Sequence, residues 1–130
     1  MPRPVPGPIR LSMGAGVDAP HAARQAVEAL AGRIDENLLE KTRLIVTELV
    51  TNSVQHAPPG EGGEVDMSIS PFPDCLRIEV TDGGSGFKLD TPELSLGQTS
   101  GWGLWLVEQL TDRYGIDRRH STRVWCEIDF

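Results

Sequence analysis

The sequence has 130 residues, 38% of them hydrophobic and 24% charged, with a formal net charge of -7 at pH 7. These values are typical of one globular domain with its own core, which we place at 9–130 behind a proline-rich, flexible lead-in at 1–8. The acidic balance disfavours nucleic acid as a main partner, because phosphate backbones are also anionic. No apolar run suits a membrane span or a signal core, so we expect a cytoplasmic protein.

The predicted elements begin with a short strand and two helices. Apolar and polar residues alternate at 9–13, which indicates the strand. Asp18 suits the N-cap of the first helix, which extends to about residue 32, and Pro20 suits its first turn. The second helix begins at 35 or 36 and continues to about 57, where a Pro-Pro-Gly sequence stops it.

The middle of the chain predicts a β-hairpin. Apolar residues alternate with polar ones at 65–69 and again at 76–80, and 71–74 supplies the turn. The second strand leads into a glycine-rich segment at 82–87. A polar loop without clear periodicity follows at 88–100.

The last third of the chain predicts a helix and a second hairpin. The helix opens at Gly101 and continues to about Arg113, with Gly115 as its breaker. Alternation at 124–130 indicates a final strand, with a hairpin partner at 114–117. The order β-α-α-β-β-α-β-β favours an α+β sandwich with helices on one face of the sheet.

The cysteines and tryptophans are interpreted mainly as core residues. Cys75 and Cys126 lie in apolar, strand-like runs, which predicts buried free thiols. We expect Trp105 and Trp125 in the core. Trp102 lies between two glycines and can be exposed.

Two polar positions carry candidate chemistry. Glu48 and Asn52 are one helical turn apart and can face one cavity, where a carboxylate can act as a base and an amide oxygen can bind Mg²⁺. The same pair also fits a solvated helix face. Asp82 ends a strand and can accept a hydrogen bond from an amine such as that of adenine, although Asp-Gly alone also fits a hairpin turn.

Glycines accompany these polar residues. Gly84 and Gly86 permit close approach of the backbone to a ligand. Gly101 and Gly103 open a helix whose free N–H groups and dipole favour phosphate, although an ordinary helix start shares this pattern. No Walker-type loop or dinucleotide fingerprint is present, and no nucleophile elbow supports a Ser/His/Asp triad.

In this order and spacing, the segments resemble the GHKL (Bergerat-fold) ATPase superfamily and, within it, the anti-sigma-factor serine kinases. The resemblance covers about 9–130. The stretch 47–57 is similar to the N-box, Asp82-x-Gly84-x-Gly86-Phe87 to the G1 box, and Gly101-x-Gly103-Leu104 to the G2 box. The resemblance to this superfamily implies a two-layer α/β sandwich whose mixed, mainly antiparallel sheet carries about three helices on one face.

The resemblance also implies roles for individual residues. Glu48 would be the general base, Asn52 would coordinate Mg²⁺, and Asp82 would read the adenine amino group. Further positions would shape the pocket or offer backbone N–H groups to the phosphates: Gly84, Gly86, Gly101, Gly103 and Leu104. The 88–100 loop would be the ATP lid, and His56 would contact this lid or serve a structural role.

The last strand departs from the family pattern. The family often has a threonine just before the Val-Trp of this strand, beside the adenine. Here Arg123 occupies that position and Thr122 precedes it. Because a one-residue shift moves a side chain to the other face of a strand, either a bulge brings Thr122 to the ATP or the contact is missing.

The implied function is that of an ATP- and Mg²⁺-dependent serine/threonine protein kinase. It would phosphorylate an anti-sigma-factor antagonist of the STAS type and regulate a sigma factor by binding it, and such proteins often form homodimers. The alternative is a non-catalytic ATP-binding regulatory module, against which the presence of Glu48 and Asn52 weighs. A histidine kinase core is disfavoured because no helical hairpin with a phosphoacceptor histidine is evident.

Overall fold

The computed structural model describes residues 7–56, 63–82, 103–117 and 122–130. Its elements confirm the predicted order, with one short 3-10 turn (η1) added after the first helix. They are β1 (Ile9–Gly14), α1 (Ala19–Val27), η1 (Glu28–Leu30), α2 (Glu36–His56), β2 (Glu64–Pro71), β3 (Cys75–Asp82), α4 (Gly103–Leu110), β4 (Arg113–Asp117) and β5 (Thr122–Asp129).

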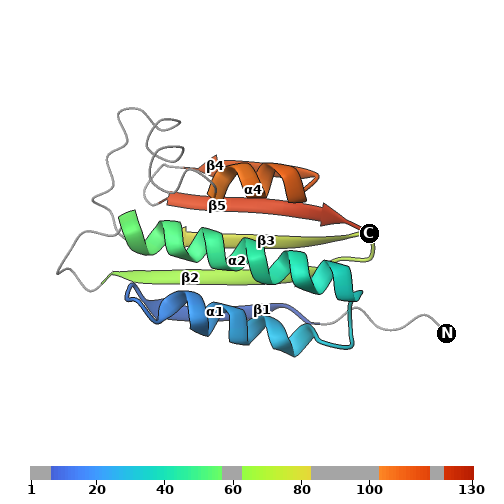
Figure 1. Ribbon diagram of the computed structural model, residues 1–130, viewed down its shortest axis with the longest axis horizontal. Helices are drawn as coiled ribbons and strands as arrows, with labels where there is room; N and C mark the ends of the chain where they lie inside the picture. The colour runs from blue at the N-terminus through green and yellow to red at the C-terminus, as the bar shows by residue number, and fades with distance from the viewer. Residues whose placement is uncertain (1–6, 57–62, 83–102, 118–121) are drawn as a thin grey trace.

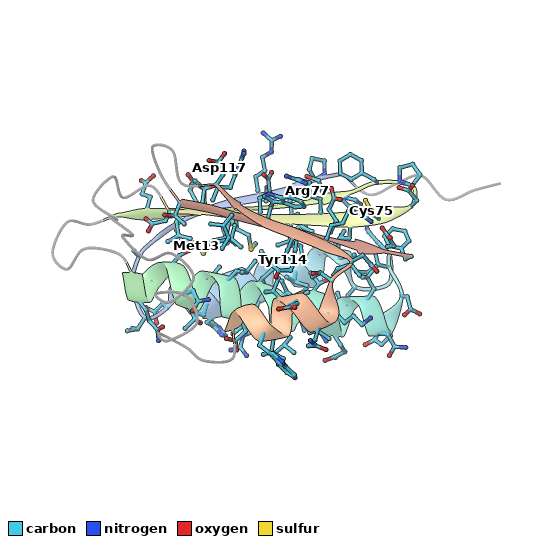
Figure 2. The ribbon with its side chains drawn as sticks, turned by 90° about the horizontal axis from the view of Figure 1, so that it is seen from above. Met13, Cys75, Arg77, Tyr114 and Asp117 are labelled. Atoms are coloured by element: carbon cyan, nitrogen blue, oxygen red, sulfur yellow. The ribbon has the colours of Figure 1, made fainter. Side chains whose placement is uncertain are left out.

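The strands form one sheet in the order β1-β2-β3-β5-β4, and its four pairings are antiparallel. Helices α1, α2 and α4 lie together on one face of this sheet (Figure 1), and Figure 2 shows them as a separate layer beneath it. The predicted α+β sandwich is therefore confirmed. None of the helices in the described ranges has the length and apolar character that a membrane span requires.

The core lies between the two layers. Alternate residues of the central strands are buried against the helices: Val65, Met67, Ile69, Leu76, Ile78, Val80, Val124, Cys126 and Ile128. The facing side of α2 contributes a second set: Leu38, Leu39, Ile45, Val46, Leu49 and Val50. Each such side chain stabilises the fold by about 1.5–3 kcal/mol relative to exposure. The even-numbered residues of β3 and β5 therefore face the helices.

The two long helices begin differently. Asp35 caps α2, because its Oδ2 accepts a hydrogen bond from the Asn37 N–H at 3.0 Å and its carbonyl accepts one from the Leu39 N–H at 2.9 Å. Asp18 stands at the N-cap position of α1 but makes no capping hydrogen bond with its side chain. A capping residue normally has an extended backbone. The backbone of Asp18 is instead helical, with φ -85 and ψ -11.

The prediction that the last helix continues to Arg113 is wrong, since α4 ends at Leu110. The chain joins the sheet there, because the Asp112 N–H donates to the Glu127 carbonyl at 2.8 Å. Gly115 does not break a helix and instead lies within β4, opposite Trp125. A Cβ on Gly115 would lie 2.7 Å from the Trp125 ring, so only glycine leaves room for this indole.

The structure also contradicts the core positions expected for two tryptophans and one cysteine. Trp105 on α4 is 50% exposed. Trp125 is an odd-numbered residue of β5, so its ring lies on the sheet face without helices, 4.5 Å below the Arg77 guanidinium. Cys126 is fully buried, which raises the pKa of its thiol to about 12. Cys75 is only half-buried, and Trp102 is outside the described residues.

Candidate functional site

Several element ends meet at one end of the sandwich. Strand β3 ends beside the start of β5, where Asp82 pairs directly with Thr122. Helix α2 packs on β3 and reaches its C-terminus at this same end, at the left of Figure 1. Helix α4 packs on α2 and begins there before leading back to β4. The fold therefore gathers candidate residues from four separate sequence segments: α2, β3, the start of α4 and the start of β5.

Asn52 and Glu48 reach this end from α2. Asn52 is 6% exposed, at the border of the apolar side of the helix, and Glu48 is half-buried one turn earlier. The third candidate of this row, His56, is the last residue of α2, and its side chain lies outside the described part of the molecule.

Asp82 continues the buried row of β3. The three preceding inward residues, Leu76, Ile78 and Val80, are fully buried, and Asp82 takes the next inward position at 3% exposure. Burying a carboxylate is costly unless polar groups compensate it. Asp82 is thus an ionisable side chain that follows three apolar ones on the inward face of β3. This arrangement is typical of a ligand site.

The buried polar groups of the described residues are few. Besides Asn52 and Asp82 they include Thr42, whose hydroxyl donates to the Leu38 carbonyl of its own helix at 2.7 Å. The buried Thr42 hydroxyl is therefore hydrogen-bonded within α2. The other two occupy the end of the sandwich where α2 and β3 terminate together.

Thr122 needs no bulge to reach this end. The pairing of β3 with β5 continues without interruption from Cys75↔Asp129 to Asp82↔Thr122. Thr122 therefore lies on the helix-covered face, directly across from Asp82, and is half-buried. Arg123 points to the opposite face, so the position expected to hold the family's threonine faces away from the site.

The glycine positions are described only in part. Gly103 is the first residue of α4 and Leu104 the second, although the side chain of Leu104 lies outside the described residues. Gly84, Gly86, Gly101 and the 88–100 loop also fall outside the described ranges.

The donor atoms suit a magnesium ion that arrives with phosphates. The Asn52 side chain offers a hard amide oxygen, and Mg²⁺ commonly takes one or two such protein ligands while phosphates and water complete its octahedron. Among the described residues, no group of three or more His, Cys, Asp or Glu side chains could hold a metal ion.

Two carboxylates on the sheet face opposite the candidate site were not identified from the sequence. Asp117 and Glu79 both contact the guanidinium of Arg123 on the face of the sheet away from the helices. The alternation of 122–129 places Arg123 on that face, but it cannot identify the residues of other strands that meet it there.

Comparison with known proteins finds a matching family model and relatives of similar sequence. Residues 15–127 match the family model of the histidine kinase-like ATPase domain, a range that includes Glu48, Asn52, Asp82 and Thr122. The serine-protein kinase RsbW of Listeria innocua is 30% identical over 118 residues, which cover 80% of this chain and 75% of that protein.

Other relatives carry the same name. RsbW of Bacillus subtilis is 33% identical over 98 residues, covering 66% of this chain and 61% of its own length. RsbW of Oceanobacillus iheyensis is 26% identical over 116 residues, with 78% and 73% covered.

Proposed function

This chain belongs to the histidine kinase-like ATPase domain family, and on that premise we propose that it is an ATP-dependent serine/threonine protein kinase of the anti-sigma-factor type. Its substrate would be a Ser or Thr of a STAS-type antagonist, and it would regulate a sigma factor by binding it. The observation that carries this proposal is the burial of Asn52 and Asp82 at the end of the sandwich where α2, β3, β5 and α4 meet.

Adenine recognition is assigned to Asp82 and Thr122. The Asp82 carboxylate only accepts hydrogen bonds, so it can receive one from the exocyclic amine of adenine. Guanine has a carbonyl oxygen at the corresponding ring position, which would face the carboxylate with like polarity. The Thr122 hydroxyl, on the same face and directly opposite, can add a second polar contact.

Phosphate binding is assigned to Asn52 and to the start of α4. The first N–H groups of a helix lack partners within it and favour anions, which suits Gly103 and Leu104 as phosphate contacts. We extend this proposal to Gly101, Gly84 and Gly86 as backbone contacts that shape the pocket. Asn52 would bind Mg²⁺, and the bound ion would offset the negative charge of the phosphate oxygens.

Glu48 is assigned the role of general base. In the transfer, the substrate hydroxyl oxygen bonds to the γ-phosphorus while the bond to the bridging oxygen of ADP breaks. The hydroxyl proton passes to the Glu48 carboxylate. Its half-buried position, one turn from Asn52, leaves it accessible to a protein substrate.

The proposed kinase function also bears on the domain bounds, the cellular compartment and the oligomeric state. We propose one domain over 9–130 with a lead-in at 1–8, which agrees with the family match over 15–127. A kinase that binds sigma factors would act in the cytoplasm, where transcription occurs. A homodimer is proposed because proteins of this type often form one.

The proposal is tested first by calorimetric titration with Mg-ATP. We expect the wild type to bind, and Asn52→Ala and Asp82→Asn to weaken binding at least about tenfold. Asn52→Ala removes a buried amide, and Asp82→Asn replaces a charged acceptor by a neutral amide that also carries a donor. Gln55→Ala, an exposed residue near Asn52 on α2, is the matched control and should bind as the wild type does. No binding by the wild type would contradict the proposal.

Catalysis is tested by transfer of labelled phosphate to a panel of STAS-type antagonists. Glu48→Gln should keep ATP binding but lower the transfer rate by about 10²- to 10⁴-fold, because it cannot accept the proton. ATP binding with no transfer to any antagonist would instead favour the alternative, a non-catalytic ATP-binding regulatory module.

A further inference from the structure

Thr122 lies at one end of β5. It is the first residue of β5 and pairs with Asp82 of β3 on one side. On the other side of β5, the next residue pairs with β4, as Arg123↔Asp117. Because strand ends open more readily than strand centres, the position of Thr122 depends on what fastens the start of β5.

Arg123 provides such a fastening on the far face of the sheet. Its Nη2 lies 3.1 Å from Asp117 Oδ2 on β4, and its Nη1 lies 3.7 Å from Glu79 Oε1 on β3. One guanidinium therefore contacts the neighbouring strand on each side of β5. Figure 2 shows Asp117 on the sheet side opposite the helices.

Both contacts belong to a longer series of ion pairs on this face. Glu79 also meets Arg77 at 3.4 Å, Arg77 meets Glu127 at 2.9 Å, and Glu127 meets Arg113 at 2.6 Å. Isolated surface ion pairs contribute little, but pairs organised in a network contribute more. Arg77 also stacks over the Trp125 ring, which restrains its side chain. The contact of Arg77 with Glu79 in turn restrains the carboxylate that Arg123 meets.

We propose that Arg123 is a positioning residue for nucleotide binding, which ties the start of β5 to β3 and β4 and thereby keeps Thr122 opposite Asp82. The inference rests on the proposed function. Arg123 does not touch the nucleotide, because its side chain lies on the opposite face of the sheet. Its effect passes through the backbone to the next residue, on the adenine side of the pocket.

The chain contains a matched control for this arginine. Arg113 of β4 also has a side chain that is 46% exposed, like that of Arg123, and it also contacts two carboxylates, Glu127 and Asp129. These contacts join β4 to the far end of β5, away from Thr122. A general effect of removing a surface cation should therefore be equal in the two variants.

The test is calorimetric titration of wild type, Arg123→Gln, Arg123→Lys and Arg113→Gln with three magnesium complexes: ATP, GTP and inorganic tripolyphosphate, which lacks a base. Arg123→Gln should weaken ATP binding about three- to tenfold, as expected for a few surface contacts, and narrow the preference for ATP over GTP. Tripolyphosphate binding should stay within about twofold. Arg123→Lys should recover part of the loss, and Arg113→Gln should bind all three as the wild type does.

Three results would overturn the inference: unchanged ATP affinity in Arg123→Gln, an equal loss in Arg113→Gln, or an equal loss for tripolyphosphate. Failure of the wild type to bind ATP would be recognised separately, because it overturns the proposed function itself. Asp117→Asn, which removes the β4 contact alone, should reproduce a smaller version of the Arg123→Gln pattern. This variant keeps the test valid if Arg123→Gln does not fold.

Discussion

At the scale of single residues, Thr122 and Arg123 are neighbours in β5 whose side chains lie on opposite faces of the sheet. Adjacent residues of a strand point to opposite faces, so the register decides which of them can reach the site. An uninterrupted pairing places Thr122 on the face of Asp82 and Arg123 on the other. Although the chain departs from the family pattern, Thr122 lies beside Asp82. The next residue, Arg123, places a cation on the opposite face of the sheet.

Gly115 is a second residue whose identity depends on one neighbour. It lies opposite Trp125 in the β4–β5 pair, and the indole occupies the space where a Cβ would stand. Glycine is required here because of the space that the indole occupies, since the φ of Gly115 is not positive.

We predict that Gly115→Ala lowers the free energy of unfolding by about 1–3 kcal/mol, because the added methyl group would displace the Trp125 ring. Gly14→Ala is the control, since a Cβ there meets nothing within 4 Å at the end of β1. Urea unfolding monitored by circular dichroism measures both. Equal effects of the two substitutions would show that the indole is not the cause.

At the scale of elements, α2 connects the core with the site. Its apolar side is buried along most of its length, and Asn52 stands on the border of that side near the C-terminus. The start of the helix is therefore remote from the candidate site. The α2 cap can be altered without touching the site.

We predict that Asp35→Ala destabilises the protein by about 1 kcal/mol, because it removes the side-chain hydrogen bond to the Asn37 N–H. Asp18→Ala should change stability by only a few tenths of a kcal/mol, since Asp18 makes no capping bond at the start of α1. Thermal unfolding of the two variants at neutral pH decides the matter. A larger loss in Asp18→Ala would contradict the assignment of the caps.

At the scale of the whole molecule, the two faces of the sheet are stabilised by different interactions. The face toward the helices is apolar, whereas the other carries arginines and carboxylates in alternating contact. Hydrogen bonds from Arg113, and then from Arg77, lower the pKa of Glu127, and those from Arg113 lower the pKa of Asp129.

This arrangement predicts the pH dependence of stability. A carboxylate with a lowered pKa in the folded state stabilises the fold above its unfolded pKa, and this contribution is lost as the pH falls through the folded pKa. The ordinary values are 4.5 for Glu127 and 3.8 for Asp129. The contribution should therefore be complete at neutral pH and disappear during acidification below these values.

Arg113→Gln should accordingly be less stable than the wild type at pH 7, and the difference should shrink as the pH falls below the ordinary carboxyl pKa values. Urea unfolding at a series of pH values measures this difference. High salt should reduce it at neutral pH, because exposed charges are screened. A difference independent of pH would show that Arg113 acts through packing rather than through its ion pairs.

The order of elements, the α+β class and the identities of Glu48, Asn52 and Asp82 as candidates could be predicted from the sequence alone. These features are local: alternation of period two, a helical row of polar residues and turn chemistry are each contained within a few consecutive residues. The apolar sides of α2, β2 and β3 could be predicted for the same reason.

Other features were decided only by the tertiary structure. Helix α4 ends at Leu110 because Asp112 bonds to Glu127, a residue far along the chain. Trp125 lies on the face without helices, and Arg123 meets Asp117 and Glu79, because strand neighbours are chosen by pairing across the sheet. A local pattern specifies which residues of a strand share a face. The neighbour that each face meets depends on burial and hydrogen bonding summed over the whole sheet, which no single segment contains.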